Sequence, residues 1–97
     1  MKNDTNSLIH LPDLLFVQCC EEEFGINRGV YNTIELWFYK KGVEEVTQRR
    51  KYALNFFLSL NPYRDKKIKI KFGHGGLVTR LEHYWKVSTQ TQLKQNA

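Results

Sequence analysis

Basic and aromatic side chains are the residues of this sequence whose types and spacing best indicate a binding surface. Lysines alternate with apolar residues over residues 66–72, and further cations and rings follow in residues 77–87. Basic groups neutralise phosphates, while exposed rings stack on unpaired bases. If they share one face, these residues form a surface for RNA or single-stranded DNA. The predicted nucleic-acid-binding residues are Lys67, Lys69, Lys71, Arg80, Lys86, Trp37, Tyr39 and Tyr84.

The same residues allow other interpretations. Alternating lysines on an exposed edge strand discourage aggregation between edges. Trp37 and Tyr39 can instead be buried in a homodimer or under the N-terminal segment. Trp, Tyr and Arg also anchor protein interfaces, so this face can hold an acidic protein, as a viral, phage or bacterial regulator would. An exposed strand can also pair with a strand of a partner or of a second copy. Nucleic acid is the leading partner and an acidic protein the alternative.

A second basic group consists of Arg49, Arg50 and Lys51. On a helix these side chains can pair back with Glu44 and Glu45, and the order from Glu45 to Arg49 is the favourable one. A solvated face held by ion pairs is the default interpretation. If the group is functional, it forms a secondary basic patch for a duplex backbone or an acidic protein.

Signatures of catalysis and metal binding are weak. The glycine-rich residues 72–76 lack the Lys and Ser/Thr of a phosphate-binding loop and favour a hairpin turn. His74 within them has no partner acid or base at helpful spacing. A metal site would have to draw Cys19, Cys20, His10 and His74 together from separate places, without any CxxC or HxxxH pair, so no metal site is predicted.

Two carboxylates, Glu35 and Glu82, fall on the same predicted face as the lysines. They could hold a divalent ion in a nuclease, but ion pairs with neighbouring cations across the strands are the favoured interpretation. The sequence therefore predicts a binding module that is not an enzyme and has no cofactor.

The element that positions these side chains is a helix over residues 43–60. Its apolar residues follow a period of 3.6, and Gly42 is the expected N-cap. Glu44 and Glu45 suit the positive N-terminus of a helix, and Asn61-Pro62 ends it. The apolar residues are Val43, Val46, Ala53, Leu54, Phe57, Leu58 and Leu60.

The segments around this helix are predicted to be strands. Apolar and polar residues alternate over residues 33–40, 66–72 and 77–87. Residues 14–20 fit either a strand or a helix that starts at Pro12 and ends at Gly25. We favour the strand, because Glu21, Glu22 and Glu23 would lie at the negative C-terminus of such a helix.

The resulting fold class is α+β, with one amphipathic helix packed on a small, mostly antiparallel four-stranded sheet in the order ββαββ. Residues 1–97 form a single domain in this interpretation, with flexible ends at 1–10 and 88–97. The net charge of +5 and pI of about 9.3 favour an anionic partner. The sequence shows no signal peptide, membrane span or disulfide framework, which predicts a cytoplasmic or nuclear protein that is not secreted.

Overall fold

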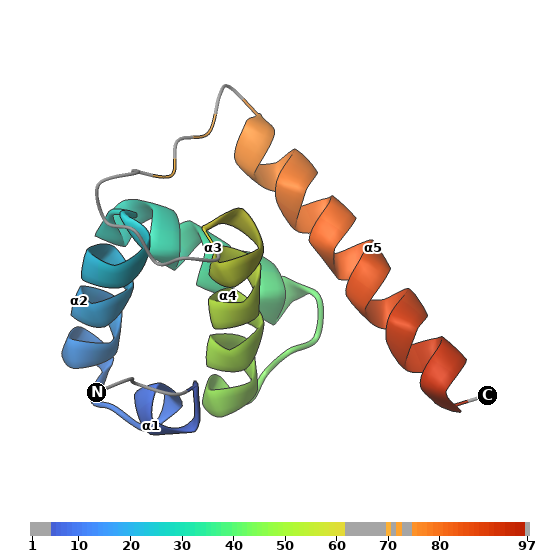
Figure 1. Ribbon diagram of the computed structural model, residues 1–97, viewed down its shortest axis with the longest axis horizontal. Coiled ribbons are helices and arrows are strands. Elements are labelled where there is room, and N and C mark those ends of the chain that lie inside the picture. Colours follow the sequence, from blue (N-terminus) through green and yellow to red (C-terminus); the bar gives the residue numbers. More distant parts are fainter. Residues whose placement is uncertain (1–4, 62–69, 71, 73–74, 97) are drawn as a thin grey trace.

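The chain is helical in its described part. The computed structural model describes residues 5–61, 70, 72 and 75–96, and these contain five helices and no strand (Figure 1). The predicted α+β fold with a four-stranded sheet is therefore wrong. The helices are α1 (Thr5–Ile9), α2 (Asp13–Phe24), α3 (Arg28–Lys40), α4 (Val46–Leu60) and α5 (Gly76–Asn96).

The helix predicted at residues 43–60 is confirmed as α4, although it begins at Val46. Glu45, in an extended conformation, is the N-cap, and the backbone N–H of Asn61 donates to the carbonyl of Phe57 at the other end. Gly42 is not the cap. It has φ of +100° in the turn after α3, a conformation that glycine adopts most easily.

Residues 14–20 belong to α2, so the favoured strand is wrong and the helical alternative is right. Pro12 is the N-cap, and Gly25 closes the other end with φ of 69°. The helix buries Phe16, Val17 and Cys20 on one side, together with Phe24 near its end. An exposed charge at a helix terminus contributes only about 0.3–1 kcal/mol, whereas burying a large apolar side chain contributes about 1.5–3 kcal/mol. The free energy gained by burying these apolar side chains therefore exceeds the electrostatic cost of the glutamates at the C-terminus of the helix.

Residues 33–40 belong to α3 rather than to a strand. The helix begins earlier, at Arg28, where the side chain of Asn27 accepts a hydrogen bond from Val30 N–H at 2.8 Å. It buries Tyr31, Ile34 and Phe38, which recur at helical spacing. Because Ile34 and Phe38 also fit the alternating pattern of a strand, this segment is compatible with both the period of 3.6 of a helix and the period of 2 of a strand.

Residues 77–87 are part of α5, so the strand predicted there is also wrong. Leu81 has no exposed surface, and Leu77, Tyr84 and Trp85 pack partly buried against the same core. The strand predicted at 66–72 lies outside the described residues except for Ile70 and Phe72, which belong to no helix. Both are partly buried beside the core, and Ile70 N–H donates to the carbonyl of Gly25.

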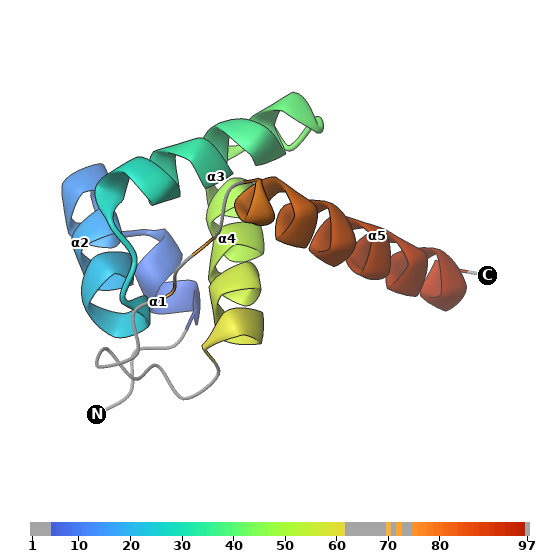
Figure 2. The same ribbon diagram turned by 90° about the horizontal axis from the view of Figure 1, so that it is seen from above.

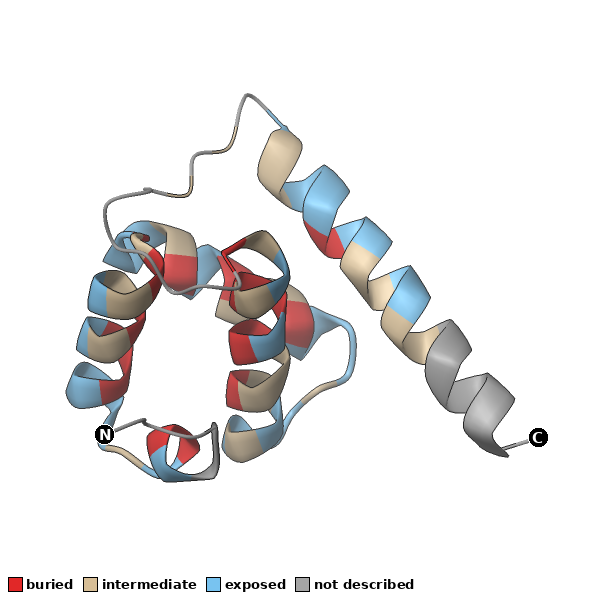
Figure 3. Cartoon of the chain, in the orientation of Figure 1, coloured by how far each residue is buried: buried red, intermediate tan, exposed pale blue. Residues whose placement is uncertain are grey.

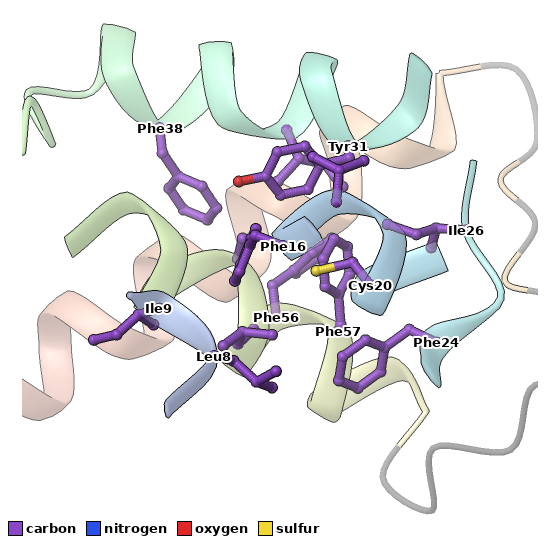
Figure 4. Packing of buried hydrophobic residues seen from close by; sticks show 14 of the residues in the cluster. Leu8, Ile9, Phe16, Cys20, Phe24, Ile26, Tyr31, Phe38, Phe56 and Phe57 are labelled. Carbon is purple, nitrogen blue, oxygen red and sulfur yellow. The ribbon is translucent and has the colours of Figure 1, made fainter. Parts of the chain in front are cut away.

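Helices α1 to α4 enclose the core. The first half of α5 lies beside α3 and α4, and its second half extends away from them (Figures 1 and 2). Buried positions face inward on each helix, as Figure 3 shows. At the centre the Phe57 ring lies 5.3 Å from Phe24 and 6.3 Å from Tyr31, while Phe16 packs against Tyr31 at 5.6 Å (Figure 4). Aromatic packing thus fixes how α2, α3 and α4 meet.

The two cysteines are free thiols with different surroundings. Cys20 is 1% exposed, and burial raises the pKa of its thiol far above the usual value. Burial, then Glu23 and Glu22, raise the pKa of the partly exposed Cys19 as well. Because the thiolate is the nucleophile, we expect iodoacetamide to alkylate Cys19 well before Cys20, with both rates rising with pH.

Tandem mass spectrometry of the alkylated peptide distinguishes the two neighbours. Denatured protein serves as the control, since both thiols are then exposed and should react at similar rates. Equal rates in the folded protein would contradict the burial of Cys20.

Candidate nucleic-acid interface

The structure places the residues of the predicted nucleic-acid face on two helices instead of a sheet. Trp37 and Tyr39 lie on α3, whereas Arg80, Tyr84 and Lys86 lie on α5. Lys67, Lys69 and Lys71 lie outside the described residues. The single flat face that would have joined all eight is therefore absent from the described part of the chain.

Two of the predicted aromatic residues join α5 to the core. Trp37 packs edge-on against Trp85, with ring centroids 6.1 Å apart. Tyr84 packs against Phe38 at 6.2 Å and Phe56 at 5.6 Å, and its burial raises the pKa of the phenol. Both rings are partly buried, so they hold the helix in place as well as contributing surface.

Tyr39 is the most exposed of the three predicted rings. It is 51% exposed, and the guanidinium of Arg49 lies 5.3 Å from its centroid. Just after α3, the amine of Lys41 lies 4.9 Å from the Trp37 ring. The end of α3 thus combines cations with aromatic rings, although these cation–π contacts also occur in purely structural settings.

Arg49, Arg50 and Lys51 are not brought together as one exposed patch. Arg49 donates to the carbonyls of Val43 at 3.2 Å and Glu44 at 2.5 Å, and it lies 3.6 Å from the Glu35 carboxylate. Arg50 is buried. Lys51 is half-buried. The expected pairing of Arg49 with Glu45 is replaced by Glu35, and Glu45 accepts from the Thr47 hydroxyl instead.

The outer side of α5 carries a basic strip, which we define as Arg80, His83 and Lys86. All three are exposed, and their spacing of three residues places them within a sector of about 120° at roughly 100° per residue. Neither Arg80 nor Lys86 forms an ion pair with a carboxylate in the described part of the chain. Their charges are therefore available to an anionic ligand.

A groove of about 700 Å³ lies beside this strip, between the end of α4 and the first half of α5. Its walls combine apolar and aromatic side chains with two aliphatic hydroxyls, the phenol hydroxyl of Tyr84 and two basic groups, and no acidic side chain lines it. The lining residues are Phe56, Ser59, Leu60, Thr79, Arg80, His83, Tyr84 and Val87. We call it the α4–α5 groove.

The groove was missed in the sequence because residues 77–87 were assigned to a strand. In an alternating strand His83 would share the face of Leu81 and Trp85 and be buried with them, whereas it is exposed at the rim of the groove. The available signal was the helical spacing of Arg80, His83, Tyr84 and Val87, at i, i+3, i+4 and i+7.

In sequence the chain is similar to the RNA-binding riboflavin kinase RibR of Bacillus subtilis (strain 168). The two are 43% identical over 79 residues, which cover 78% of this chain and 34% of that protein. The chain thus spans about one third of the length of this curated relative. No family model matches the chain, and no solved structure matches it.

The comparison corrects the prediction of a protein that is not an enzyme. The relative is named as a kinase, so the chain is similar to part of an enzyme. The match covers only a third of it and points to an enzyme-related domain. The relative is also named as RNA-binding, which agrees in kind with the nucleic-acid partner predicted from the charge and the aromatic residues.

Two further features bear on the kind of site. No helix in residues 5–61 or 75–96 is long and apolar enough to cross a membrane. Among the same residues, no three His, Cys, Asp or Glu side chains gather where they could hold a metal ion.

Proposed function

We propose that this chain binds RNA, with the basic strip of α5 as part of its contact surface. The observation that carries the proposal is the 43% identity to a protein named as RNA-binding. The net charge of +5 supports it, because phosphate neutralisation supplies much of the affinity in such complexes.

The fold suits this role because one side of α5 is anchored while the other is free. Leu81, Tyr84 and Trp85 hold the inner side against the core. Arg80 and Lys86 then extend from the outer side, where they can contact successive phosphates. Lys67, Lys69 and Lys71 precede α5 in the sequence and are proposed as further phosphate contacts.

The proposal predicts how the strip acts in binding. The affinity of the full-length chain for labelled single-stranded RNA is measured by fluorescence anisotropy over a series of salt concentrations. Arg80→Gln combined with Lys86→Gln should weaken binding on the order of tenfold at low salt. The slope of log affinity against log salt should also become shallower by roughly 0.7 for each phosphate that the variant no longer neutralises.

Arg28→Gln is the matched control, because Arg28 is an exposed cation on the first turn of α3, outside the α4–α5 groove. It should leave both affinity and slope close to those of the wild type. Because Arg28→Gln removes one charge and the α5 variant removes two, a loss of log affinity in Arg28→Gln about half that of the α5 variant would mean that net charge alone drives binding. Failure of the wild type to bind RNA at low salt would overturn the proposed function.

The name of the relative supports a second candidate, a part in riboflavin phosphorylation. The test is to incubate the chain with riboflavin, ATP and Mg²⁺ and follow flavin mononucleotide by chromatography. Product formation would assign kinase chemistry to this chain. Absence of product would leave RNA binding as the function proposed for this chain.

A further inference from the structure

We propose that the α4–α5 groove receives one unpaired RNA base, so that the chain prefers single-stranded or looped RNA to duplex. This inference rests on the proposed RNA-binding function and adds the form of RNA and the place where a base is bound. Three observations support it: the size of the groove, the residues that line it, and the hydrogen bonds that its Ser59 and Thr79 hydroxyls already donate.

The groove has the dimensions and the walls that a planar ring requires. Its volume of about 700 Å³ lies within the roughly 300–1,000 Å³ typical of small-molecule sites. Leu60, Tyr84 and Val87 supply apolar and aromatic surface, and Val87 is 47% exposed. A base that leaves its stack would cover this surface with its face and turn its edge toward the hydroxyls of Ser59 and Thr79.

The charges around the groove suit a nucleotide better than an apolar segment of a protein. Arg80 and His83 line the rim, Lys86 lies one turn beyond His83 on the same helix, and no acidic side chain lines the groove. A phosphate attached to the bound base would therefore meet cations on α5. A protein strand or helix would have to be both apolar and acidic to match the same features.

Ser59 and Thr79, which carry the two aliphatic hydroxyls of the groove wall, indicate which bases fit. Ser59 donates its proton to the carbonyl of Phe56 at 2.6 Å, and Thr79 donates to the carbonyl of Gly75 at 3.2 Å. Because each proton is engaged, each oxygen faces a ligand as an acceptor. Exocyclic amino groups are donors at the side of the ring, whereas the single edge donor of uracil, N3–H, stands between two carbonyls that an acceptor repels, so cytosine and adenine should be favoured over uracil.

Paired bases cannot make this contact. In an RNA duplex the bases are stacked and their pairing edges are occupied, and sequence-specific recognition of RNA is mostly of unpaired bases. Binding in the groove thus requires a single strand, a loop or a bulge.

Two variants at one position test the groove. Ser59→Phe fills it with a ring and leaves the charge unchanged, whereas Ser59→Ala removes the acceptor alone. Affinities are measured for labelled oligo(rC), oligo(rA) and oligo(rU) of equal length and for a duplex RNA. The control is Gln48→Phe, which adds the same ring at an exposed position of α4 outside the groove.

The wild type should bind oligo(rC) and oligo(rA) roughly fivefold to tenfold more tightly than oligo(rU), the value of about one hydrogen bond. Ser59→Ala should reduce that preference to about twofold or less. Ser59→Phe should weaken all three single strands by about tenfold or more without changing the salt slope or the binding of duplex. Gln48→Phe should behave as the wild type.

The measurements distinguish a failure of the proposed RNA binding from a failure of the proposed base site. If the wild type binds none of the RNAs, the proposed function fails and this inference fails with it. If the wild type binds single strands and Ser59→Phe binds them equally well, RNA binding stands and the groove is not its base site. Equal affinity of the wild type for duplex and single strands would overturn the inference in the same way.

Discussion

Replacement of Phe38 by alanine is expected to lower the free energy of unfolding by about 3–5 kcal/mol. Phe38 has no exposed surface, and it is the residue of α3 at which three helices meet. Its ring stacks on Tyr52 of α4 at 5.4 Å and contacts Tyr84 and Trp85 of α5 at 6.2 and 6.1 Å. Alanine would leave a cavity bordered by both helices.

Urea unfolding followed by circular dichroism measures this change in stability. Domains of this size have a total stability of about 5–15 kcal/mol, so the variant should unfold at a much lower urea concentration. Tyr39→Ala is the matched control, because the neighbouring ring is 51% exposed and should cost little. Equal effects of the two variants would contradict the position of Phe38 between α3, α4 and α5.

The packing of α5 explains why Phe38 is expected to affect RNA binding as well as stability. α5 is held by few fully buried side chains, and Leu81 is the one with no exposed surface among its described residues. Its other anchors include the partly buried rings of Tyr84 and Trp85, which both contact Phe38. A loosened α5 would move one wall of the α4–α5 groove and the basic strip together. RNA affinity should therefore fall along with stability in Phe38→Ala.

The sequence predicted one element well because a single period described it. In residues 43–60 the apolar residues fit a helix and do not alternate, so α4 was correctly predicted. In residues 33–40 the pattern of Ile34, Leu36 and Phe38 alternates, but Leu36 is 52% exposed in the fold. The helical set of Tyr31, Ile34 and Phe38 is the one that is buried. Tyr31, three residues before Ile34, lies on the buried face with Ile34 and Phe38. Its position fits the helical period and lies outside the alternating segment.

The candidate site was predicted in its chemistry but not in its geometry. The type and exposure of Arg80 and Lys86 could be predicted, because cations are seldom buried without partners. Ser59 carried no signal until both helices and their contact were known, and the helical spacing of His83 from Arg80 was overlooked because the segment was assigned to a strand. Arg50 was assigned to an exposed basic patch, and only the position of α1 and α2 beside α4 shows that it is buried.

Arg50→Met is expected to lower the free energy of unfolding by about 2–4 kcal/mol, since each buried carbonyl left without a partner costs about 1–3 kcal/mol. Arg50 is 5% exposed, and its guanidinium donates to the carbonyls of Ile9 at 2.9 Å and Leu11 at 2.6 Å and to the carboxylate of Asp13. It thereby ties the end of α1 and the start of α2 to α4. Methionine keeps much of the volume but none of the donors.

Asp13→Asn separates the contribution of the backbone bonds from that of the ion pair. The side chain of Asp13 is 92% exposed, so solvent screens the pair, and the two carbonyl bonds remain in this variant. Its destabilisation in urea should be far smaller than that of Arg50→Met. RNA affinity of folded Arg50→Met should also stay close to the wild type, because a buried arginine offers nothing to a phosphate. If Arg50→Met is as stable as the wild type but binds RNA weakly, Arg50 belongs to an exposed binding surface after all.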